Sequence, residues 1–450
     1  MNLRERERID VRSVLPLSLK AFLPKKESPA AIEQEKEGIP VDGITVDMLK
    51  LLVVFAIIVV VMALKKPISI AVVLASLGAV LLYQLPMADT WNAFVLGATG
   101  ATTIDALLVF YAITFLQRMM EKRKNLSNSQ VALNGLFNNR RVNASVAPFL
   151  LGCLPAASTV LICGPIVRDS VGESLTTPEQ AAVTSYFRHI SESFLPTYTT
   201  IFIAVGLTSG AVTVPGFVIA MLPMVLALFI AGYVVYLRRI PKDTGITPDQ
   251  SKTQYGLLLL KSVWAIALAI VLILVFNMRV YIAVSVCIVL NFFVNRFTLK
   301  EIVPFLRSAF EGKLLLSTWL VMIFKEILSA TGVIHKLPEF FSLLPIPMFL
   351  VFALIFFFGT VVAGSQAIVV LCMPMAIAAL NGGPALSLFV LLMCMNYVAS
   401  QTSPVHICLT LCAEDFKVPL GSMVVKTLPM VGFFTVLSFA YYFLLRLVGL

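Results

Sequence analysis

Two apolar stretches of this chain are interrupted in the same way, and they occupy corresponding places in its two halves. Residues 152–158 read Gly-Cys-Leu-Pro-Ala-Ala-Ser, and residues 359–365 read Gly-Thr-Val-Val-Ala-Gly-Ser. A second break, which contains a proline, follows each stretch at residues 191–196 and 400–404. Interrupted hydrophobic segments at matching positions of two halves are the sequence pattern expected around a binding site of a membrane transporter.

The composition predicts a multi-pass membrane protein. Hydrophobic residues make up 59% of the 450 residues, charged residues only 13%, and the mean hydropathy is +0.94. A chain with this composition has too few polar residues to cover the surface of a soluble globule of 450 residues. The net charge of +10 is carried in short loops beside apolar segments, where cations set membrane orientation. We therefore expect the lipid bilayer of the cell membrane, and no nucleic acid, as a partner.

The seven cysteines all lie in apolar runs and show no paired ligand spacing. This pattern predicts small buried side chains, without disulfides and without a metal site.

Apolar runs long enough to cross a bilayer occur five times in each half. They are predicted at residues 48–64, 67–85, 104–120, 177–208 and 214–237, and again at 256–276, 279–296, 314–331, 384–413 and 420–447. The fourth span of each half contains the proline break. One more apolar segment, at 145–167 and at 346–380, has turn formers in its middle and is predicted to be a re-entrant helical hairpin, because irregular backbone in a membrane must be covered by protein or water.

Five crossings in each repeat is an odd number, so the second repeat is predicted to be inverted relative to the first. The loop 86–103 lacks Lys and Arg, whereas its counterpart carries four cations, and the positive-inside rule places the two loops on opposite sides. The expected fold is an all-α polytopic membrane protein with two inverted repeats, each holding five spans, one hairpin and one broken helix. The domains are a polar tail (1–47), the first repeat (48–238), a cytoplasmic linker (239–255) and the second repeat (256–450).

The hairpin turns and helix breaks are predicted to meet near the centre of the membrane. A proline removes one helical hydrogen bond, so Pro155, Pro196 and Pro404 are the expected helix breaks. Freed helix N-termini favour an anionic group, and unwound carbonyls favour a small cation such as sodium. The candidate substrate- or ion-binding residues are Ser158, Thr159, Ser365, Gln366, Ser193, Thr197, Thr402, Ser403 and His406. Any single Ser or Thr among them could instead bond to its own helix backbone.

Three ionisable residues, Arg188, His189 and Glu192, lie just before Pro196, the proline of the first break. Charges at membrane depth are costly and are functional by default, which indicates proton coupling or contact with a carboxylate. An interfacial ion-pair patch is the equally weighted alternative, because a helix that starts at Pro178 rises only about 20 Å by Glu192.

Three stretches resemble a known family. Residues 324–328 (Phe-Lys-Glu-Ile-Leu), the hairpin 359–374 and the run 400–417, which contains Ser-Pro-Val-His-Ile-Cys-Leu, are similar to domain-of-unknown-function family 401, an uncharacterised prokaryotic membrane family. The resemblance covers residues 48–450. That family is grouped with the ion transporter superfamily, alongside gluconate, citrate and dicarboxylate permeases.

The resemblance implies inverted repeats, an elevator motion, a homodimer and a place in the prokaryotic plasma membrane. In relatives, Ser-Asn-Thr motifs at the hairpin turns bind a carboxylate and sodium. Here the turns read Ala157-Ser158-Thr159 and Gly364-Ser365-Gln366, and they lack the asparagine.

The leading functional hypothesis is a secondary active transporter of a small anionic solute, driven by a sodium or proton gradient and without a cofactor other than sodium. The chain has no Gly-rich ATP-binding loop, which excludes a self-contained pump of that type. A cation/proton antiporter is the alternative, and the presence of carboxylates at the hairpin turns would favour it. An intramembrane enzyme is a distant third hypothesis, since the chain has no His-Glu-x-x-His pair and only three histidines.

Overall fold

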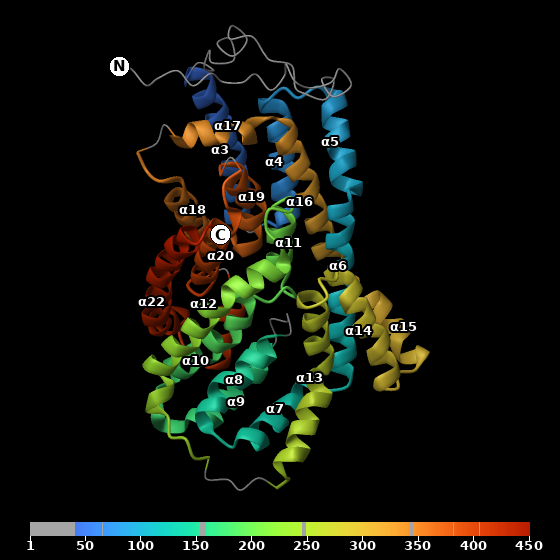
Figure 1. The fold of residues 1–450 in the computed structure, drawn as a ribbon, viewed down its shortest axis with the longest axis vertical. Helices are drawn as coiled ribbons and strands as arrows, with labels where there is room; N and C mark the ends of the chain where they lie inside the picture. The colour runs from blue at the N-terminus through green and yellow to red at the C-terminus, as the bar shows by residue number, and fades with distance from the viewer. Residues whose placement is uncertain are drawn as a thin grey trace, which may run out of the picture. The chain divides into compact units, whose positions relative to one another are not determined.

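A computed structural model describes residues 41–64, 66–153, 159–244, 249–342, 345–380, 382–404 and 406–450. Within these ranges every regular element longer than three residues is an α-helix (Figure 1). The all-α class predicted from the sequence is confirmed.

The first half contains ten α-helices among the described residues. They are α3 (Val41–Ala63), α4 (Ile68–Leu82), α5 (Met87–Thr99), α6 (Ala101–Lys122), α7 (Asn125–Phe137), α8 (Arg140–Gly152), α9 (Thr159–Val171), α10 (Thr177–Ile190), α11 (Thr199–Gly206) and α12 (Val214–Val235).

The second half contains ten more. They are α13 (Lys252–Leu274), α14 (Val280–Val294), α15 (Leu299–Ser308), α16 (Gly312–Ala330), α17 (Val333–Ser342), α18 (Met348–Ala363), α19 (Ser365–Ala378), α20 (Ala385–Ser400), α21 (Ile407–Asp415) and α22 (Leu420–Leu447).

The two halves share one order of helices, so that α3 corresponds to α13 and each following helix to its counterpart, through α12 and α22. The first two pairs even have equal lengths, 23 residues for α3 and α13 and 15 residues for α4 and α14. The short α11 and α21 follow α10 and α20 after a break in both halves. Local sequence signals, namely apolar runs ended by Pro, Gly and polar residues, account for this shared order.

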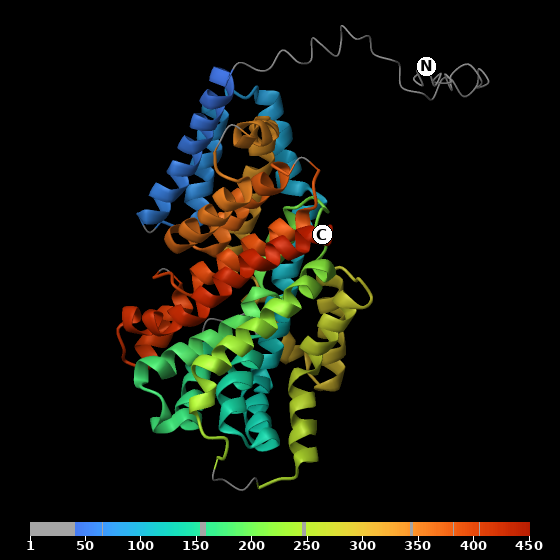
Figure 2. The same ribbon diagram turned by 60° about the vertical axis from the view of Figure 1, so that its left-hand side comes forward.

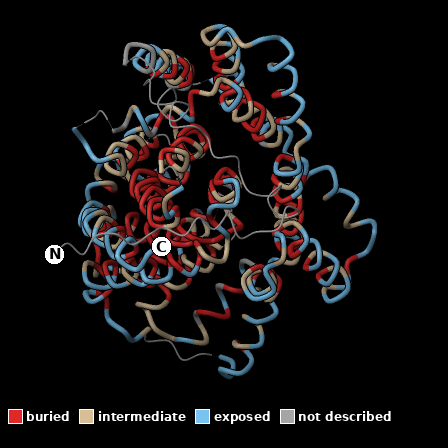
Figure 3. Tube along the Cα trace, turned by 45° about the horizontal axis from the view of Figure 1, so that its top comes forward, coloured by how far each residue is buried: buried red, intermediate tan, exposed pale blue. Residues whose placement is uncertain are grey.

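Four helical stretches of the described residues are long and apolar enough to cross a membrane. They are Met87–Lys122, Val214–Arg239, Lys252–Leu274 and Leu420–Leu447. Figure 3 colours exposed residues pale blue along the outer helices, and many of the exposed residues are large and apolar. Side chains of this kind face lipid in a membrane protein, and the chain is an integral membrane protein.

The prediction of a loop at residues 86–103 is wrong. This segment forms α5, which packs closely against α16, and the counterpart loop contains α15. A Cβ atom at Gly97 would lie 2.5 Å from the Ile323 backbone, so the glycine lets the two helices approach. The short α5 has no strong apolar run of its own, and its tertiary packing against α16 stabilises it.

The helices form two packing groups. A peripheral group contains α3–α7 and α13–α17, in which α16 packs on α4, α5 and α6, and α14 packs on α6. A central group contains α8–α12 and α18–α22, in which α10 contacts α8, α9 and α22, and α20 contacts α18 and α22. Figure 2 shows the red α22 of the second half beside green helices of the first half. The halves are therefore intertwined in the central group, and their two broken helices lie there together.

Candidate functional site

Both proline-containing breaks are present where the sequence predicts them. The first separates α10 from α11 and contains a short 3-10 helix, η3 (Ser191–Ser193), and Pro196. The second separates α20 from α21 and contains Pro404. Because proline donates no amide hydrogen bond, neither helix continues across its break.

The two hairpins turn differently. In the second hairpin a single residue, Gly364, separates α18 from α19, and its φ of +86° is a conformation that favours glycine. The predicted turn residues Ser365 and Gln366 are consequently the first two residues of α19. In the first hairpin α8 ends at Gly152 and α9 begins at Thr159. The predicted residues Pro155 and Ser158 lie outside the described residues.

A partly enclosed cavity of about 70 Å³ lies where the breaks and the second hairpin meet. The elements that line it are the first break, the start of α11, the tip of the second hairpin, α20 and the second break. The lining residues are Glu192, Tyr198, Thr200, Ser365, Met393, Asn396, Tyr397, Ser400 and His406. Of the residues predicted for the site, Glu192, Ser365 and His406 reach this cavity.

Three helices begin at the cavity. Tyr198 is the residue before α11, Ser365 is the first residue of α19, and His406 is the residue before α21. The unpaired amides at a helix start carry a partial positive charge. Each of these helix starts therefore adds a partial positive charge near the cavity, whose wall also holds the Glu192 carboxylate.

The tip of the second hairpin is held by an asparagine of α20. Asn396 Nδ2 donates to Ser365 Oγ at 2.6 Å, and Thr360 Oγ1 donates to Asn396 Oδ1 at 2.9 Å. Beside them, the buried hydroxyl of Tyr397 has no hydrogen-bond partner among the described residues. The cavity thus offers hydroxyl and amide groups to a polar solute.

Arg188 is the largest fully buried side chain among the described residues and connects three elements. Its Nε donates to Thr159 Oγ1 at 3.0 Å, at the start of α9, and its Nη1 donates to Glu192 Oε1. The backbone of α8 approaches α10 closely here, since a Cβ at Gly152 would lie 2.1 Å from the Arg188 carbonyl oxygen. A buried charge is stable only when it is paired and hydrogen-bonded, and Glu192 and Thr159 meet that requirement.

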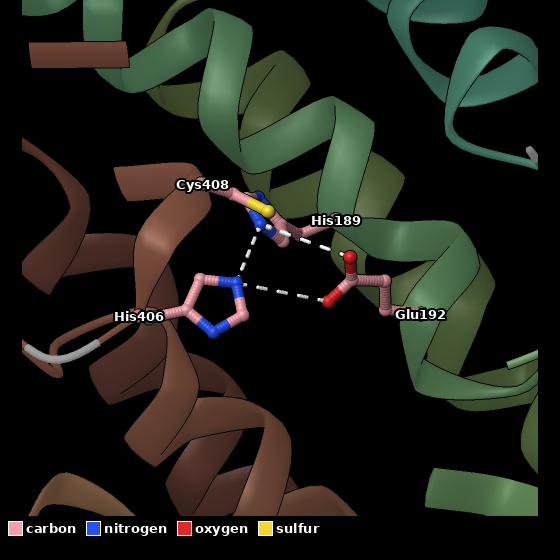
Figure 4. A group of neighbouring side chains, drawn as sticks. All are labelled: His189, Glu192, His406 and Cys408. Carbon is pink, nitrogen blue, oxygen red and sulfur yellow. Dashed lines mark hydrogen bonds and ion pairs between the residues drawn. The ribbon is translucent and has the colours of Figure 1, made fainter. Parts of the chain in front are cut away.

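Figure 4 shows His189 and His406 facing each other across the two halves, with Glu192 and Cys408 beside them. The two Nε2 atoms are 3.0 Å apart. Glu192 Oε1 lies 4.0 Å from His189 Nε2, and Glu192 Oε2 lies 3.9 Å from His406 Nε2. On the far side of its ring, His189 Nδ1 lies 2.5 Å from the Ser185 carbonyl oxygen, so it carries the hydrogen in the neutral ring and leaves Nε2 as a lone pair.

Several other predicted residues bond to backbone. Ser193 Oγ donates to Ile190 O at 2.7 Å, Thr402 Oγ1 to Ala399 O at 3.1 Å, and Ser403 Oγ to Val361 O at 2.9 Å. Ser193 and Thr402 thus show the local backbone bonding that is common for these residue types near helix ends, whereas Ser403 links the second break to α18.

The remaining two predicted residues, Thr197 and Gln366, do not line this cavity. Thr197 lines a small separate space between the first break and helices α6, α13 and α14. Its buried hydroxyl and the buried Nε2 of Gln366 have no hydrogen-bond partner among the described residues.

Sequence reasoning missed part of the cavity wall. Tyr198, Asn396, Tyr397 and Ser400 line it. A polar residue in the middle of the apolar α20 was the available signal for Asn396. Cys408, treated only as a buried apolar residue, lies with its Sγ 3.6 Å from Arg188 Nη1.

A family model described as a protein of unknown function, DUF401, matches residues 48–445 of the chain. The chain belongs to the DUF401 family. This confirms the family that residues 324–328, 359–374 and 400–417 indicated. Among curated proteins, no match to this DUF401 protein is found.

The fold of this DUF401 protein is similar to that of a solved membrane protein. The crystal structure of the YdaH transporter of Alcanivorax borkumensis, described as having an unusual topology, matches with a TM-score of 0.52 and 12% sequence identity. The match covers 79% of this chain and 86% of that chain. At this identity the similarity concerns the fold.

Proposed function

We propose that this DUF401 protein is a secondary active transporter, a permease that moves a small anionic solute such as an organic acid across the prokaryotic plasma membrane. One observation carries the proposal. The starts of α11, α19 and α21, which come from both halves, converge on one polar cavity between two broken helices and a hairpin tip. Converging helix N-termini are a common device for holding an anion within a membrane protein.

The similarity to YdaH adds a second argument, because that protein is a transporter of the same fold. We also propose that the DUF401 family belongs with the ion transporter superfamily. The gradient that drives transport is one of sodium or protons, and the residues offered for coupling remain Arg188, His189 and Glu192 at the first break.

The packing of the helices favours an elevator motion. The central group, which holds the cavity, contacts the peripheral group mainly where α7 contacts α8, α11 contacts α6, α17 and α16 contact α19, and α12 contacts α13. These are small interfaces compared with the packing inside each group. We propose that the central group moves as one body against the peripheral group, within a homodimer.

Gradient-driven uptake tests the function. The protein is reconstituted in liposomes and offered labelled mono-, di- and tricarboxylates and inorganic anions under a sodium gradient, a proton gradient or neither. We expect uptake of at least one anion that depends on one gradient. Ser365→Trp should abolish uptake because the larger side chain fills the cavity, whereas Ser422→Trp at the exposed start of α22 should not. The proposal would be refuted if none of the anions showed gradient-dependent uptake.

The elevator motion has its own test. Gln117 of α6 and Cys153 at the end of α8 line the same small space between the two groups. In a variant that keeps Cys153 and lacks the other six cysteines, Gln117→Cys should allow a mercuric ion to bridge the two thiols. The bridge should stop uptake until an excess of a small thiol takes up the mercuric ion and frees both cysteines. Full uptake by the bridged protein would refute a relative motion of the groups at this place.

A cation/proton antiporter remains the second candidate, because a carboxylate does reach the level of the hairpin tip: Glu192 and Ser365 line the same cavity. The negative charge of Glu192 is paired with the positive charge of Arg188. Because the carboxylate already has a cationic partner, the pairing favours the anion transporter over the cation/proton antiporter. The liposome experiment separates the two, since an antiporter would exchange sodium for protons when no organic or inorganic anion gradient is present.

A further inference from the structure

We infer that His189, His406, Glu192 and Cys408 form a binding site for a divalent metal ion of the zinc type at the junction of the two broken helices. The inference concerns metal binding alone and holds or fails independently of transport. It differs from the expectation drawn from the sequence, which shows no ligand spacing because His189 and His406 are 217 positions apart.

The four donor atoms are close enough to share one ion. Each side chain offers one ligand atom, and the four atoms all lie within 4.8 Å of one another. Zinc binds nitrogen at about 2.0–2.1 Å with tetrahedral geometry, so two such nitrogens lie about 3.4 Å apart. The imidazole nitrogens are 3.0 Å apart and the carboxylate oxygens 3.9–4.0 Å from them. Shifts of the side chains by less than about 1 Å therefore complete the coordination.

The surroundings of His189 fit a ligand role. A metal-bound histidine usually donates its other ring nitrogen to a carbonyl or carboxylate, which fixes the ring and its tautomer. His189 Nδ1 makes that contact with the Ser185 carbonyl and aims its Nε2 lone pair at the cluster. The ring is fully buried, so its direction is set by packing before an ion arrives.

Arg188 is the feature that limits what the site can hold. Its guanidinium occupies Glu192 Oε1 and leaves Oε2, the atom nearer His406, for an ion. The charges of Arg188 and Glu192 cancel, so a divalent ion adds two positive charges to this wall. A thiolate at Cys408, with its Sγ 3.6 Å from the guanidinium, balances one of them. The second positive charge of the ion favours binding of an anion on the side that faces the cavity. Glu192 and His406 line that cavity.

Metal titration of the purified protein tests the site. The chain is purified through a peptide tag that contains no histidine, treated with a chelator, and titrated with zinc chloride and with cobalt chloride. We expect one zinc ion per chain by elemental analysis and calorimetry, and a cobalt spectrum with a thiolate charge-transfer band.

Variants assign the ligands. His406→Ala and Glu192→Gln should weaken zinc binding by more than the roughly 10–100-fold that loss of an outer-shell partner costs. His335→Ala, which removes the exposed third histidine in α17, should leave binding unchanged. Cys408→Ser should remove the thiolate band, whereas Cys412→Ser on the same helix should keep it.

Each outcome decides the inference. Failure of the wild type to bind zinc stoichiometrically, or full binding by the His189→Ala/His406→Ala double variant, overturns the site. A thiolate band that persists in Cys408→Ser overturns the assignment of the fourth ligand. If the histidine variants do not fold, as judged by size-exclusion profile and thermal unfolding, the wild-type cobalt spectrum decides, and an octahedral spectrum without a thiolate band overturns the site.

Discussion

Asn396 Nδ2 donates a hydrogen bond to Ser365 Oγ across 2.6 Å, and this contact holds the tip of the second hairpin against α20. The two residues also line the cavity in which we place the solute. The pair forms part of the polar wall of the cavity.

Ser365→Ala and Asn396→Ala should each weaken the apparent affinity for the transported anion by about tenfold, the effect of losing one hydrogen bond of roughly 1.4 kcal/mol. The measurement is the concentration dependence of gradient-driven uptake. The matched control is Ser422→Ala, whose hydroxyl donates to Pro419 O at the exposed start of α22. An unchanged half-saturation concentration in both cavity variants would show that the solute does not contact this pair.

From the Arg188–Glu192 ion pair we predict that the effects of substituting the two residues on the free energy of unfolding are strongly coupled. Removing either charge leaves the other buried without its partner, which typically costs about 3–5 kcal/mol. We expect Arg188→Gln and Glu192→Gln each to lower the free energy of unfolding in mixed micelles by that order. The double variant should lose clearly less than the two single losses added together. Additive losses would mean that the two side chains are not energetically coupled.

The ion pair between Arg123 and Glu301 lies outside the predicted spans. From it we predict that the stability of the fold depends on pH. Arg123 Nη1 donates to Glu301 Oε1 at 2.8 Å, and the Thr298 amide donates to Oε2 at 2.9 Å. These hydrogen bonds lower the pKa of Glu301 from its ordinary value of 4.5 to about 2. A carboxyl group whose pKa is lower in the folded state than in the unfolded state stabilises the fold at pH values above the unfolded pKa. This stabilisation is lost as the pH falls through the folded-state pKa.

Glu301→Gln keeps the capping role at the start of α15 and removes the charge. Its melting temperature should lie below that of the wild type at neutral pH, and the difference should shrink as pH falls from about 4.5 towards 2. Thermal unfolding in detergent across this range is the measurement. A difference that is constant with pH would contradict the assigned pKa shift.

Gly97 predicts a packing effect in the peripheral group. A Cβ at this position would lie 2.5 Å from the Ile323 backbone, which cannot move as a flexible side chain can. Gly97→Ala should therefore destabilise the protein by about 1–3 kcal/mol, the usual cost of overpacking. The control is Gly432→Ala in α22, where a Cβ meets no atom within 4 Å. Equal unfolding free energies for the two variants would show that α5 and α16 are not tightly packed.

Much of the fold could be predicted because its signals are local. Long apolar runs, the prolines at 196 and 404 and the small residues near 152 and 364 act on their own helices, and helices do end close to these positions, at Gly152, Ile190, Ala363 and Ser400. The short α5, α7, α15 and α17 were not predicted, because each is stabilised by contacts with helices distant in the sequence. Three of the residues predicted from their position, Glu192, Ser365 and His406, line the cavity. Ser193 and Thr402 were not brought to the cavity, since a hydroxyl near a helix end can bond to its own backbone.

The sequence by itself determined that this is an all-helical membrane protein of the DUF401 family with the same order of helices in both halves, because hydrophobicity, helix breaks and motif letters are properties of single segments. Only the tertiary structure decided that Arg188 pairs with Glu192 and donates to Thr159, that Asn396 donates to Ser365, and that His189 faces His406. These pairings depend on how each helix is rotated and how closely neighbours approach. Rotation and approach result from packing of side chains from both halves at once, which no single segment specifies.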